Sequence, residues 1–277
     1  MKSFSFRETR STVMTMTTKT DNRRPTSQEL CFFLSRYCSW LLGCGATCIR
    51  LEKNVTRMAQ AYGKETDMTI MPRHVHISVW EKGTTDTVTS IASMHHCPTS
   101  FNMNSRLSEL SWEVADGKIS FDKAVGRFNR IISDDNQNRW TVLLLVALAN
   151  ASFCRLFGGD TAAMAIVAGA TMAGYYIKQL LLSRGLDLRI VFIACAFVSA
   201  VLGATGCLFA IGTTPSVALG TSVLYLVPGI PFLNSFSDML CRHYICAICR
   251  FADALVLTAC LSAGLCCAML LMDVGMF

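Results

Sequence analysis

Long apolar segments in the second half of the chain constrain its fold more than any other feature of the sequence. Most of the charged residues lie before Arg139, and five apolar runs follow it. Each run approaches the ~20 residues that a helix needs to cross a hydrocarbon core about 30 Å thick. The sequence therefore predicts an α-helical integral membrane protein with a five-helix transmembrane bundle in residues 139–277. The predicted spans cover about residues 140–157, 160–182, 189–211, 215–233 and 251–272.

The positions of Lys and Arg predict how the chain is oriented. Cations flank the start of the first span and the second and fourth connections, whereas the first and third connections hold only Arg155. Because cytoplasmic loops carry an excess of Lys and Arg, we expect the N-terminus in the cytoplasm and the C-terminus outside. No basic run is interleaved with aromatic residues, so nucleic acid is not an expected partner. The flanking cations are Arg127, Arg130, Arg139, Lys178, Arg184, Arg189, Arg242 and Arg250.

The polar first half predicts a region outside the membrane. Residues 1–25 are Thr-rich and lack an apolar run, so we expect a disordered tail and no signal peptide. Residues 26–135 mix helical and strand-like periodicities, which predicts a cytoplasmic α+β domain.

Local patterns place the elements of this domain. Thr26 and Glu29 form a capping-box pattern before the apolar run Leu30–Leu42, which predicts a helix. A second helix is expected over residues 47–62, with Asn54 on its polar face. An alternating stretch then predicts two or three short strands, and the helical period returns after them. The apolar positions of that stretch are Val75, Ile77 and Val79, and the later helical runs cover residues 107–114 and 121–132.

Several classes of site lack support in the sequence. No phosphate-binding loop is present, so we expect an ion gradient rather than ATP to drive any active transport. No nucleophile elbow or H-E-x-x-H motif occurs, and neither an enzyme nor a cofactor is expected. The fourteen cysteines are expected to be reduced thiols. A C-x-H-x2-C-x2-C run is too tight for a usual zinc finger, so no metal is expected; its members are Cys241, His243, Cys246 and Cys249.

The fourth apolar segment carries the main candidate for a substrate pathway. Pro228, Gly229 and Pro231 interrupt helical hydrogen bonding, and such a break in lipid needs protein or water around it. Transporters use discontinuous helices to present backbone groups to their substrates. The alternative interpretation is that the prolines only end the helix near the cytoplasmic face.

Polar residues after the break extend this candidate. Asn234, Ser237 and Asp238 follow within two helical turns, where they can line the cytoplasmic mouth of a pathway. In this interpretation Asp238 accepts a proton or a cation. Alternatively, Asp238 is a solvated loop carboxylate.

Two further pairs lie near the ends of predicted spans. Lys178 and Gln179 are near the inner end of the second span, where the lysine either attracts an anionic substrate or extends to the headgroups. Arg250 and Asp253 are three residues apart, so we expect them to form an ion pair on one helix face. The alternative is that Asp253 is a coupling carboxylate.

Four segments carry a resemblance to a known family. They are GCGATCIRLE (Gly43–Glu52), RWTVLLLVALANASFCRLFGGD (Arg139–Asp160), YYIKQLL (Tyr175–Leu181) and LVPGIPFLNSFSDML (Leu226–Leu240). In order and spacing they resemble the threonine/serine exporter family, over about residues 28–275. The chain is most similar to the family's short, five-helix subunits, which work with a second small membrane subunit. The resemblance implies a hetero-oligomeric secondary exporter of small carboxylate solutes, with succinate or another dicarboxylate as the first expected substrate.

Two alternatives stay open at this point. Hydroxy amino acids also present a carboxylate, so threonine or serine is the alternative substrate. A different class of function is a regulatory membrane subunit whose cytoplasmic domain senses a ligand while another protein conducts.

Overall fold

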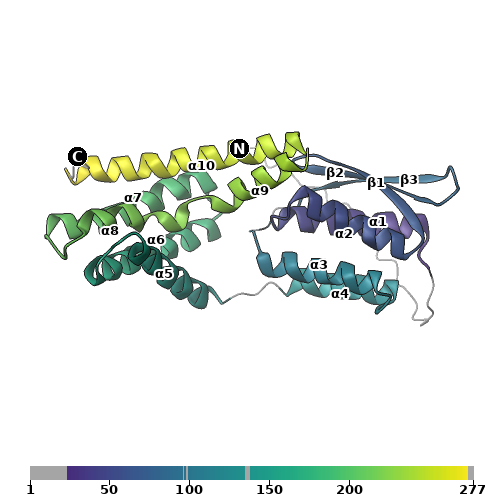
Figure 1. The fold of residues 1–277 in the computed structure, drawn as a ribbon, viewed down its shortest axis with the longest axis horizontal. Coiled ribbons are helices and arrows are strands. Elements are labelled where there is room, and N and C mark those ends of the chain that lie inside the picture. Colours follow the sequence, from purple (N-terminus) through teal and green to yellow (C-terminus); the bar gives the residue numbers. More distant parts are fainter. Residues whose placement is uncertain (1–23, 96, 98, 135–137, 274–277) are drawn as a thin grey trace, which may run out of the picture.

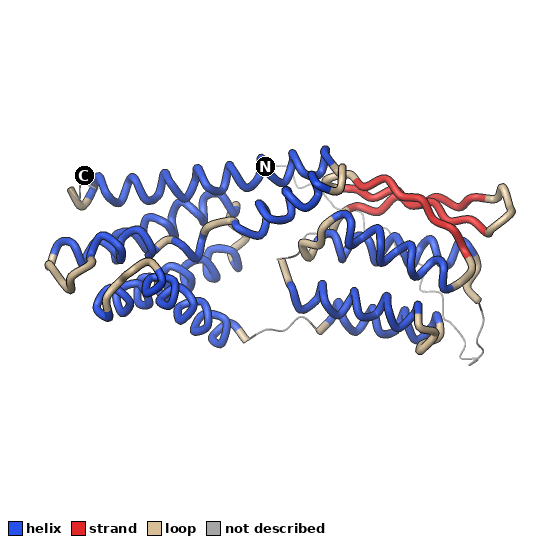
Figure 2. Tube along the Cα trace, viewed as in Figure 1, coloured by secondary structure: helices blue, strands red, loops and turns tan. Residues whose placement is uncertain are grey.

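A computed structural model describes residues 24–95, 97, 99–134 and 138–273. The molecule is elongated, with the sheet at one end and the C-terminal end of α10 (Tyr244–Leu271) at the other (Figure 1). The strands lie together at one end of the molecule, and the other elements of the described chain are helices joined by loops (Figure 2). The predicted disordered tail lies outside the described residues, apart from Arg24 and Pro25.

A helical hairpin opens the described chain, formed by α1 (Ser27–Gly43) and α2 (Cys48–Ala61). The predicted capping box is confirmed: the Glu29 amide donates to Thr26 Oγ1 at 3.2 Å, and the Thr26 amide donates to Glu29 Oε2 at 2.9 Å. These bonds satisfy amides at the helix start that have no intrahelical partner. The turn between the helices uses Gly45 at φ +88°, a conformation that favours glycine.

An antiparallel sheet packs on α1. Its strands, in spatial order, are β1 (Lys64–Ile70), β2 (His74–Glu81) and β3 (Thr87–Ser93). The predicted alternation in β2 is confirmed, because three alternate apolar residues are fully buried while the residues between them are exposed or half-buried. The buried residues are Val75, Ile77 and Val79.

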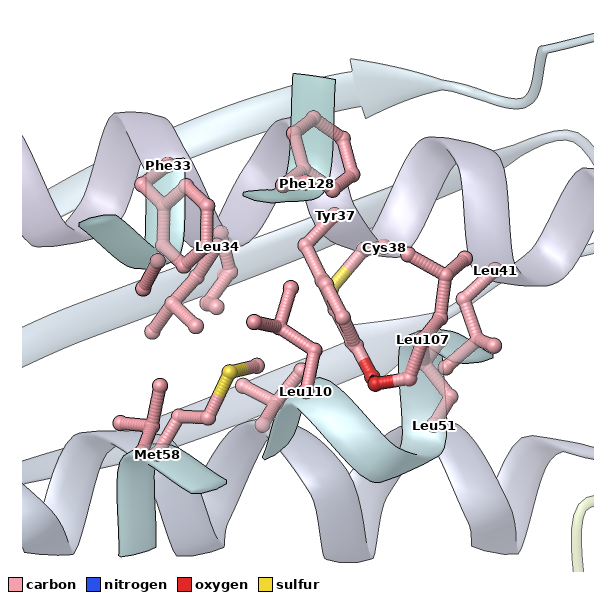
Figure 3. Packing of buried hydrophobic residues seen from close by; sticks show 14 of the residues in the cluster. Phe33, Leu34, Tyr37, Cys38, Leu41, Leu51, Met58, Leu107, Leu110 and Phe128 are labelled. Atoms are coloured by element: carbon pink, nitrogen blue, oxygen red, sulfur yellow. The ribbon is translucent and has the colours of Figure 1, made fainter. Parts of the chain in front are cut away.

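A second helical pair, α3 (Phe101–Ala115) and α4 (Phe121–Ser133), completes one apolar core with α1, α2 and the sheet. Residues 24–134 are called the N-terminal unit below. Figure 3 shows side chains from all four helices packed together in this core. The Phe33 and Phe128 rings meet edge-on with centroids 5.7 Å apart, an arrangement that aromatic pairs prefer.

Tyr37 joins three helices at the centre of this core (Figure 3). Its hydroxyl donates to the Leu107 carbonyl at 2.8 Å and accepts from Asn54 Nδ2 at 3.0 Å. Burial raises the pKa of Tyr37 well above its usual range. Asn54 was expected on the polar face of α2 but is only 3% exposed, because α3 covers that face and places Ser108 Oγ 3.2 Å from the amide nitrogen.

Four helices in the second part of the chain are long and apolar enough to cross a membrane: α5 (Arg139–Leu156), α6 (Thr161–Ser183), α7 (Leu188–Leu208) and α10. They correspond to the first, second, third and fifth predicted spans. A bent pair of helices makes the number of candidate spans in the described chain five, if the pair is one span. The pair consists of α8 (Pro215–Ser222) with the 3₁₀ turn η1 (Leu224–Leu226), then α9 (Gly229–Leu240), at an angle of 59°.

The fourth predicted span, residues 215–233, is thus a broken helix and not a continuous one. Pro228 has no amide proton, so the helical hydrogen bonds cannot continue through it. Pro231 lies in the first turn of α9, where a missing amide is tolerated. The prolines therefore precede a new helix that reaches Leu240.

The last helix also starts earlier than predicted. α10 begins at Tyr244, whereas the apolar pattern placed the start near residue 251. Its first two turns contact the N-terminal unit, which supplies partners for the polar side chains there.

Candidate functional site

The carboxylate of Asp238 is fully buried where α9 meets the N-terminal unit. Arg250 Nη1 lies 3.2 Å from Asp238 Oδ2, and the Cys48 backbone amide donates to Oδ1 at 2.8 Å. Cys48 is the first residue of α2, so the carboxylate also lies at the positive end of a helix dipole. A cation, a hydrogen bond and a helix end together replace the water that the carboxylate lost on burial.

Further polar contacts join the same two parts of the molecule. Arg250 Nη2 donates to the Ala46 carbonyl at 2.9 Å, and Asn234 Nδ2 donates to the Gly45 carbonyl at 2.8 Å. We call this interface the junction. On the side of the N-terminal unit it comprises Gly45, Ala46, Cys48 and Glu52, and on the side of α9 and α10 it comprises Asn234, Asp238, His243 and Arg250. His243 Nε2 lies 3.5 Å from Glu52 Oε2.

The junction corrects the sequence-based interpretation of two carboxylates. Asp238 is not a solvated loop residue, because it is fully buried and lies in α9. Arg250 pairs with Asp238 and not with Asp253, which is exposed on α10. The spacing along the helix permits the expected pair, but the guanidinium instead turns toward α9 and the α1–α2 turn, where the buried carboxylate lies.

A buried thiol also contacts the Asp238 carboxylate. Cys48 Sγ lies 3.5 Å from Asp238 Oδ2. The pKa of Cys48 is raised far above its usual range by its hydrogen bond to the Cys246 thiol, by burial and by the charge of Asp238. The Cys48 thiol is the donor in this contact with the carboxylate. All fourteen cysteines are free, as predicted.

The other predicted pathway residues of this segment lie in α9 or directly before it. Pro228 is buried, Pro231 is half-buried, and Gly229 is exposed with nothing within 4 Å of an added Cβ. Ser237 is half-buried. The buried hydroxyl of α9 is that of Ser235, which donates to the Ala247 carbonyl at 2.8 Å and holds α9 against α10.

A second polar cluster lies inside the helix bundle, beside the broken span. Asn150 of α5 is 2% exposed, and its Nδ2 donates to Thr171 Oγ1 at 2.6 Å and to the Thr221 carbonyl at 3.1 Å. Asn150 Oδ1 is buried and has no hydrogen-bond partner among the described residues. Polar groups within a membrane are costly, and an acceptor without a partner is a candidate contact for a solute or for water.

The same cluster includes two hydroxyls that face each other. Ser199 Oγ lies 2.9 Å from the Tyr225 hydroxyl, which η1 supplies next to the break. Gly174 of α6 makes room for them, because a Cβ at this position would overlap both oxygens. We call these residues the bundle cluster: Asn150, Thr171, Ser199, Thr221 and Tyr225.

Sequence analysis did not identify the bundle cluster. Serine and threonine are common in membrane helices, so Thr171 and Ser199 do not stand out in their spans. The sequence signal that could have revealed the cluster is Asn150, a side-chain amide within the first apolar run. Its partners lie 21 and 71 residues away in sequence, and only packing brings them together.

Lys178 and Gln179 lie near the junction end of α6 but belong to neither cluster. Lys178 Nζ lies 5.2 Å from the Phe192 ring centroid and 5.6 Å from that of Tyr175, within reach of cation–π attraction. Gln179 Nε2 donates to the Arg139 carbonyl at 3.3 Å, so it fastens the start of α5 to the end of α6.

The described residues hold no group of three His, Cys, Asp or Glu side chains placed to bind a metal ion. Within the C-x-H-x2-C-x2-C run, Cys246 contacts the Ile70 carbonyl at 3.4 Å and His243 faces Glu52. Cys246 and His243 therefore have structural partners in the N-terminal unit.

Comparison with known proteins identifies the family. The family described as "Putative threonine/serine exporter" (ThrE) matches residues 33–272. This chain belongs to the ThrE family. The match begins within α1 and ends at Met272, directly after α10.

Two curated relatives are similar over part of their length. Proteins of Klebsiella aerogenes and Escherichia coli (strain K12), both named "Probable succinate transporter subunit YjjP", are 36% identical over 132 residues and 37% identical over 129 residues. These matches cover 47% and 46% of this chain, and 51% and 50% of the relatives. The chain thus spans about half the length of the curated relatives it matches. No solved structure matches the chain.

Proposed function

We propose that this ThrE-family chain is one subunit of a membrane exporter for small carboxylate solutes, with succinate as the first candidate substrate. The family description and the printed names of both relatives support an exporter subunit. The observation that carries the proposal is the group of hydroxyls in the helix bundle beside the broken fourth span, those of Thr171, Ser199 and Tyr225.

The bundle cluster has the chemistry that a carboxylate solute requires. A carboxylate only accepts hydrogen bonds, and Thr171, Ser199 and Tyr225 supply hydroxyl donors beside the Asn150 amide. Lys178 follows Thr171 on α6 by about 10 Å of helix, given the ~1.5 Å rise per residue, and adds positive charge toward the junction end. We infer that the solute passes this cluster on its way across the membrane, and that α9 moves at the Pro228 break.

The proposed path leads from the junction side to the far side of the bundle. Most flanking cations lie at the junction end, which supports a cytoplasmic N-terminal unit in the bacterial inner membrane and a periplasmic C-terminus. A reporter fused after Phe277 that works only in the periplasm tests this orientation. The word "subunit" in the relatives' names supports a second membrane subunit and a hetero-oligomer.

Threonine and serine are the second candidate substrates, because the family description names them. Both carry a carboxylate that suits the same hydroxyl donors. Their ammonium group needs an additional acceptor, and Asn150 Oδ1 is an available one.

The test is efflux from bacteria that lack their own exporters. The chain is expressed alone, with a candidate second subunit, and as Asn150→Ala with that subunit, and extracellular succinate, threonine and serine are followed by mass spectrometry. We expect efflux of one solute that requires both subunits and is lost in the variant. If none of the three solutes leaves faster while both proteins are folded in the membrane, the export proposal is wrong.

A further inference from the structure

A basic groove lies on the N-terminal unit, outside the helices assigned to the membrane. It has a volume of about 500 Å³ and lies between α2 and α3. Its lining includes three cations, two hydroxyls and one indole, and no Asp or Glu is among the described residues that line it. The six residues are Arg50, Lys53, Arg57, Ser105, Ser108 and Trp112.

The positive charge of this groove is not neutralised within the described chain. Arg50 Nη1 donates to Asn104 Oδ1 at 3.0 Å, and Arg57 Nη1 donates to Asn54 Oδ1 at 3.1 Å and to Ser111 Oγ at 2.7 Å. These acceptors are all neutral. No carboxylate of the described residues forms an ion pair with Arg50, Arg57 or Lys53.

A second groove on α3 and α4 provides a contrast. It has a similar volume, about 530 Å³, and is also lined by cations. There, however, Arg106 pairs with Asp134 at 3.2 Å, and Arg127 pairs with Glu113 at 2.6 Å. Acidic side chains thus already neutralise part of the positive charge of the α3–α4 groove. The α2–α3 groove is therefore the better site for an anion.

The cations of the α2–α3 groove are spaced along one helix face. Arg50, Lys53 and Arg57 follow one another by three and four residues, so they lie about 4.5 and 6 Å apart along the axis. The guanidinium of Arg57 is held over the Trp112 ring, 3.5 Å from its centroid, which fixes its plane. Two carboxylates joined by a short carbon chain fit this spacing, with the indole beside the chain.

We propose that the α2–α3 groove binds a small soluble dicarboxylate. The choice of dicarboxylates among anions rests on the proposed function, whereas the site itself rests on the groove. Thr47 and Ile49 also line the groove, and the residue between them, Cys48, holds Asp238 at the junction. A dicarboxylate bound in the groove therefore contacts the first turn of α2, and the same turn holds α9 through Cys48 and Asp238. Through this turn the N-terminal unit can sense the solute.

The test measures binding without transport. The full chain is purified in a neutral detergent, which removes anionic lipid headgroups as a competing source of ligand, and succinate is titrated by calorimetry. The test variant is Arg50→Gln with Lys53→Gln. The matched control is Lys123→Gln with Arg130→Gln, which removes two exposed cations from the α3–α4 groove. Inorganic phosphate is titrated in parallel.

We expect the wild type and the control to bind succinate alike, and the test variant to bind at least about tenfold more weakly, since it loses two charge-assisted contacts. All four substituted residues are exposed, so folding should be kept, and circular dichroism checks this. The inference is overturned if the wild type does not bind succinate, or if the test variant binds it as well as the wild type. It is also overturned if both variants lose succinate binding equally, or if phosphate binds more tightly than succinate. Efflux measured separately distinguishes the two proposals, because export without groove binding contradicts only this one.

Discussion

Asp238 and Arg250 form an ion pair at 3.2 Å in which the carboxylate has no solvent exposure and the arginine side chain retains 20%. The pair joins α9 to α10, and the same two side chains hold the α1–α2 turn through Cys48 and Ala46. The bent fourth span and the N-terminal unit therefore share one set of polar contacts. If α9 moves at the Pro228 break, either α10 and the α1–α2 turn move with it or these contacts break.

Asp238→Asn should destabilise the protein by about 3–5 kcal/mol, because removal of one partner leaves the other charge buried without compensation. The Asn side-chain oxygen can still accept a hydrogen bond from the Cys48 amide. The loss of stability therefore measures the contribution of the charge and not that of the hydrogen bond. The apparent unfolding temperature in detergent measures the effect. Asp253→Asn, at an exposed carboxylate on α10, is the matched control and should change little. Adding Arg250→Gln to Asp238→Asn should recover part of the loss; no recovery would argue against the pair.

Gly174→Ala should lower stability and efflux, because the new Cβ would overlap Ser199 Oγ and the Tyr225 hydroxyl. Gly169→Ala in the same helix is the control, since nothing lies within 4 Å of its added Cβ. That change should be neutral or stabilising by up to about 1 kcal/mol, as expected for Gly to Ala in a helix. Ser199→Ala combined with Gly174→Ala should relieve part of the overlap. Equal effects of the two glycine substitutions would contradict the packing described for the bundle cluster.

Asn150→Ala should reduce efflux at least about tenfold while lowering stability only modestly. The variant loses two hydrogen bonds, and bonds between membrane helices are worth on average about 0.6 kcal/mol each. Ser152→Ala, an exposed hydroxyl two residues along α5, controls for changes to this helix. Efflux is normalised to the amount of folded protein in the membrane. Wild-type efflux by the Asn150 variant would remove the bundle cluster from the proposed path.

Asp160 should make stability depend on acid pH. Hydrogen bonds from the Thr213 and Ala163 amides lower its pKa to about 2. The bonds from Thr213 also fasten the start of α6 to the α7–α8 loop. Because the folded pKa is below the ordinary value, the stabilisation is present above pH ~4 and is lost as the pH falls toward 2. Unfolding temperatures between pH 5 and 2.5 should fall more steeply for the wild type than for Asp160→Asn, whose amide can still cap the helix. Parallel curves for the two proteins would count against this role.

Structural features that depend on residues close together in the sequence were predictable from the sequence. The capping box of Thr26 and Glu29, the alternation of Val75, Ile77 and Val79, and four of the candidate membrane spans all follow from residue types and their order within one segment. The break at Pro228 was also predictable, since proline removes a donor wherever it lies. The extent of α9 to Leu240 was not, because its last turns are stabilised by contacts with other segments.

The environment of each polar side chain was decided only by the tertiary structure. Sequence spacing paired Arg250 with Asp253, whereas packing placed it against Asp238, and Asp238 itself contacts Cys48, 190 residues away. Asn150 meets Thr221 across 71 residues for the same reason. Hydrophobic periodicity determines which segments enter lipid and which faces are apolar. Burial, charge pairing and unsatisfied acceptors depend on which distant segments come together, and a one-dimensional pattern does not contain that information.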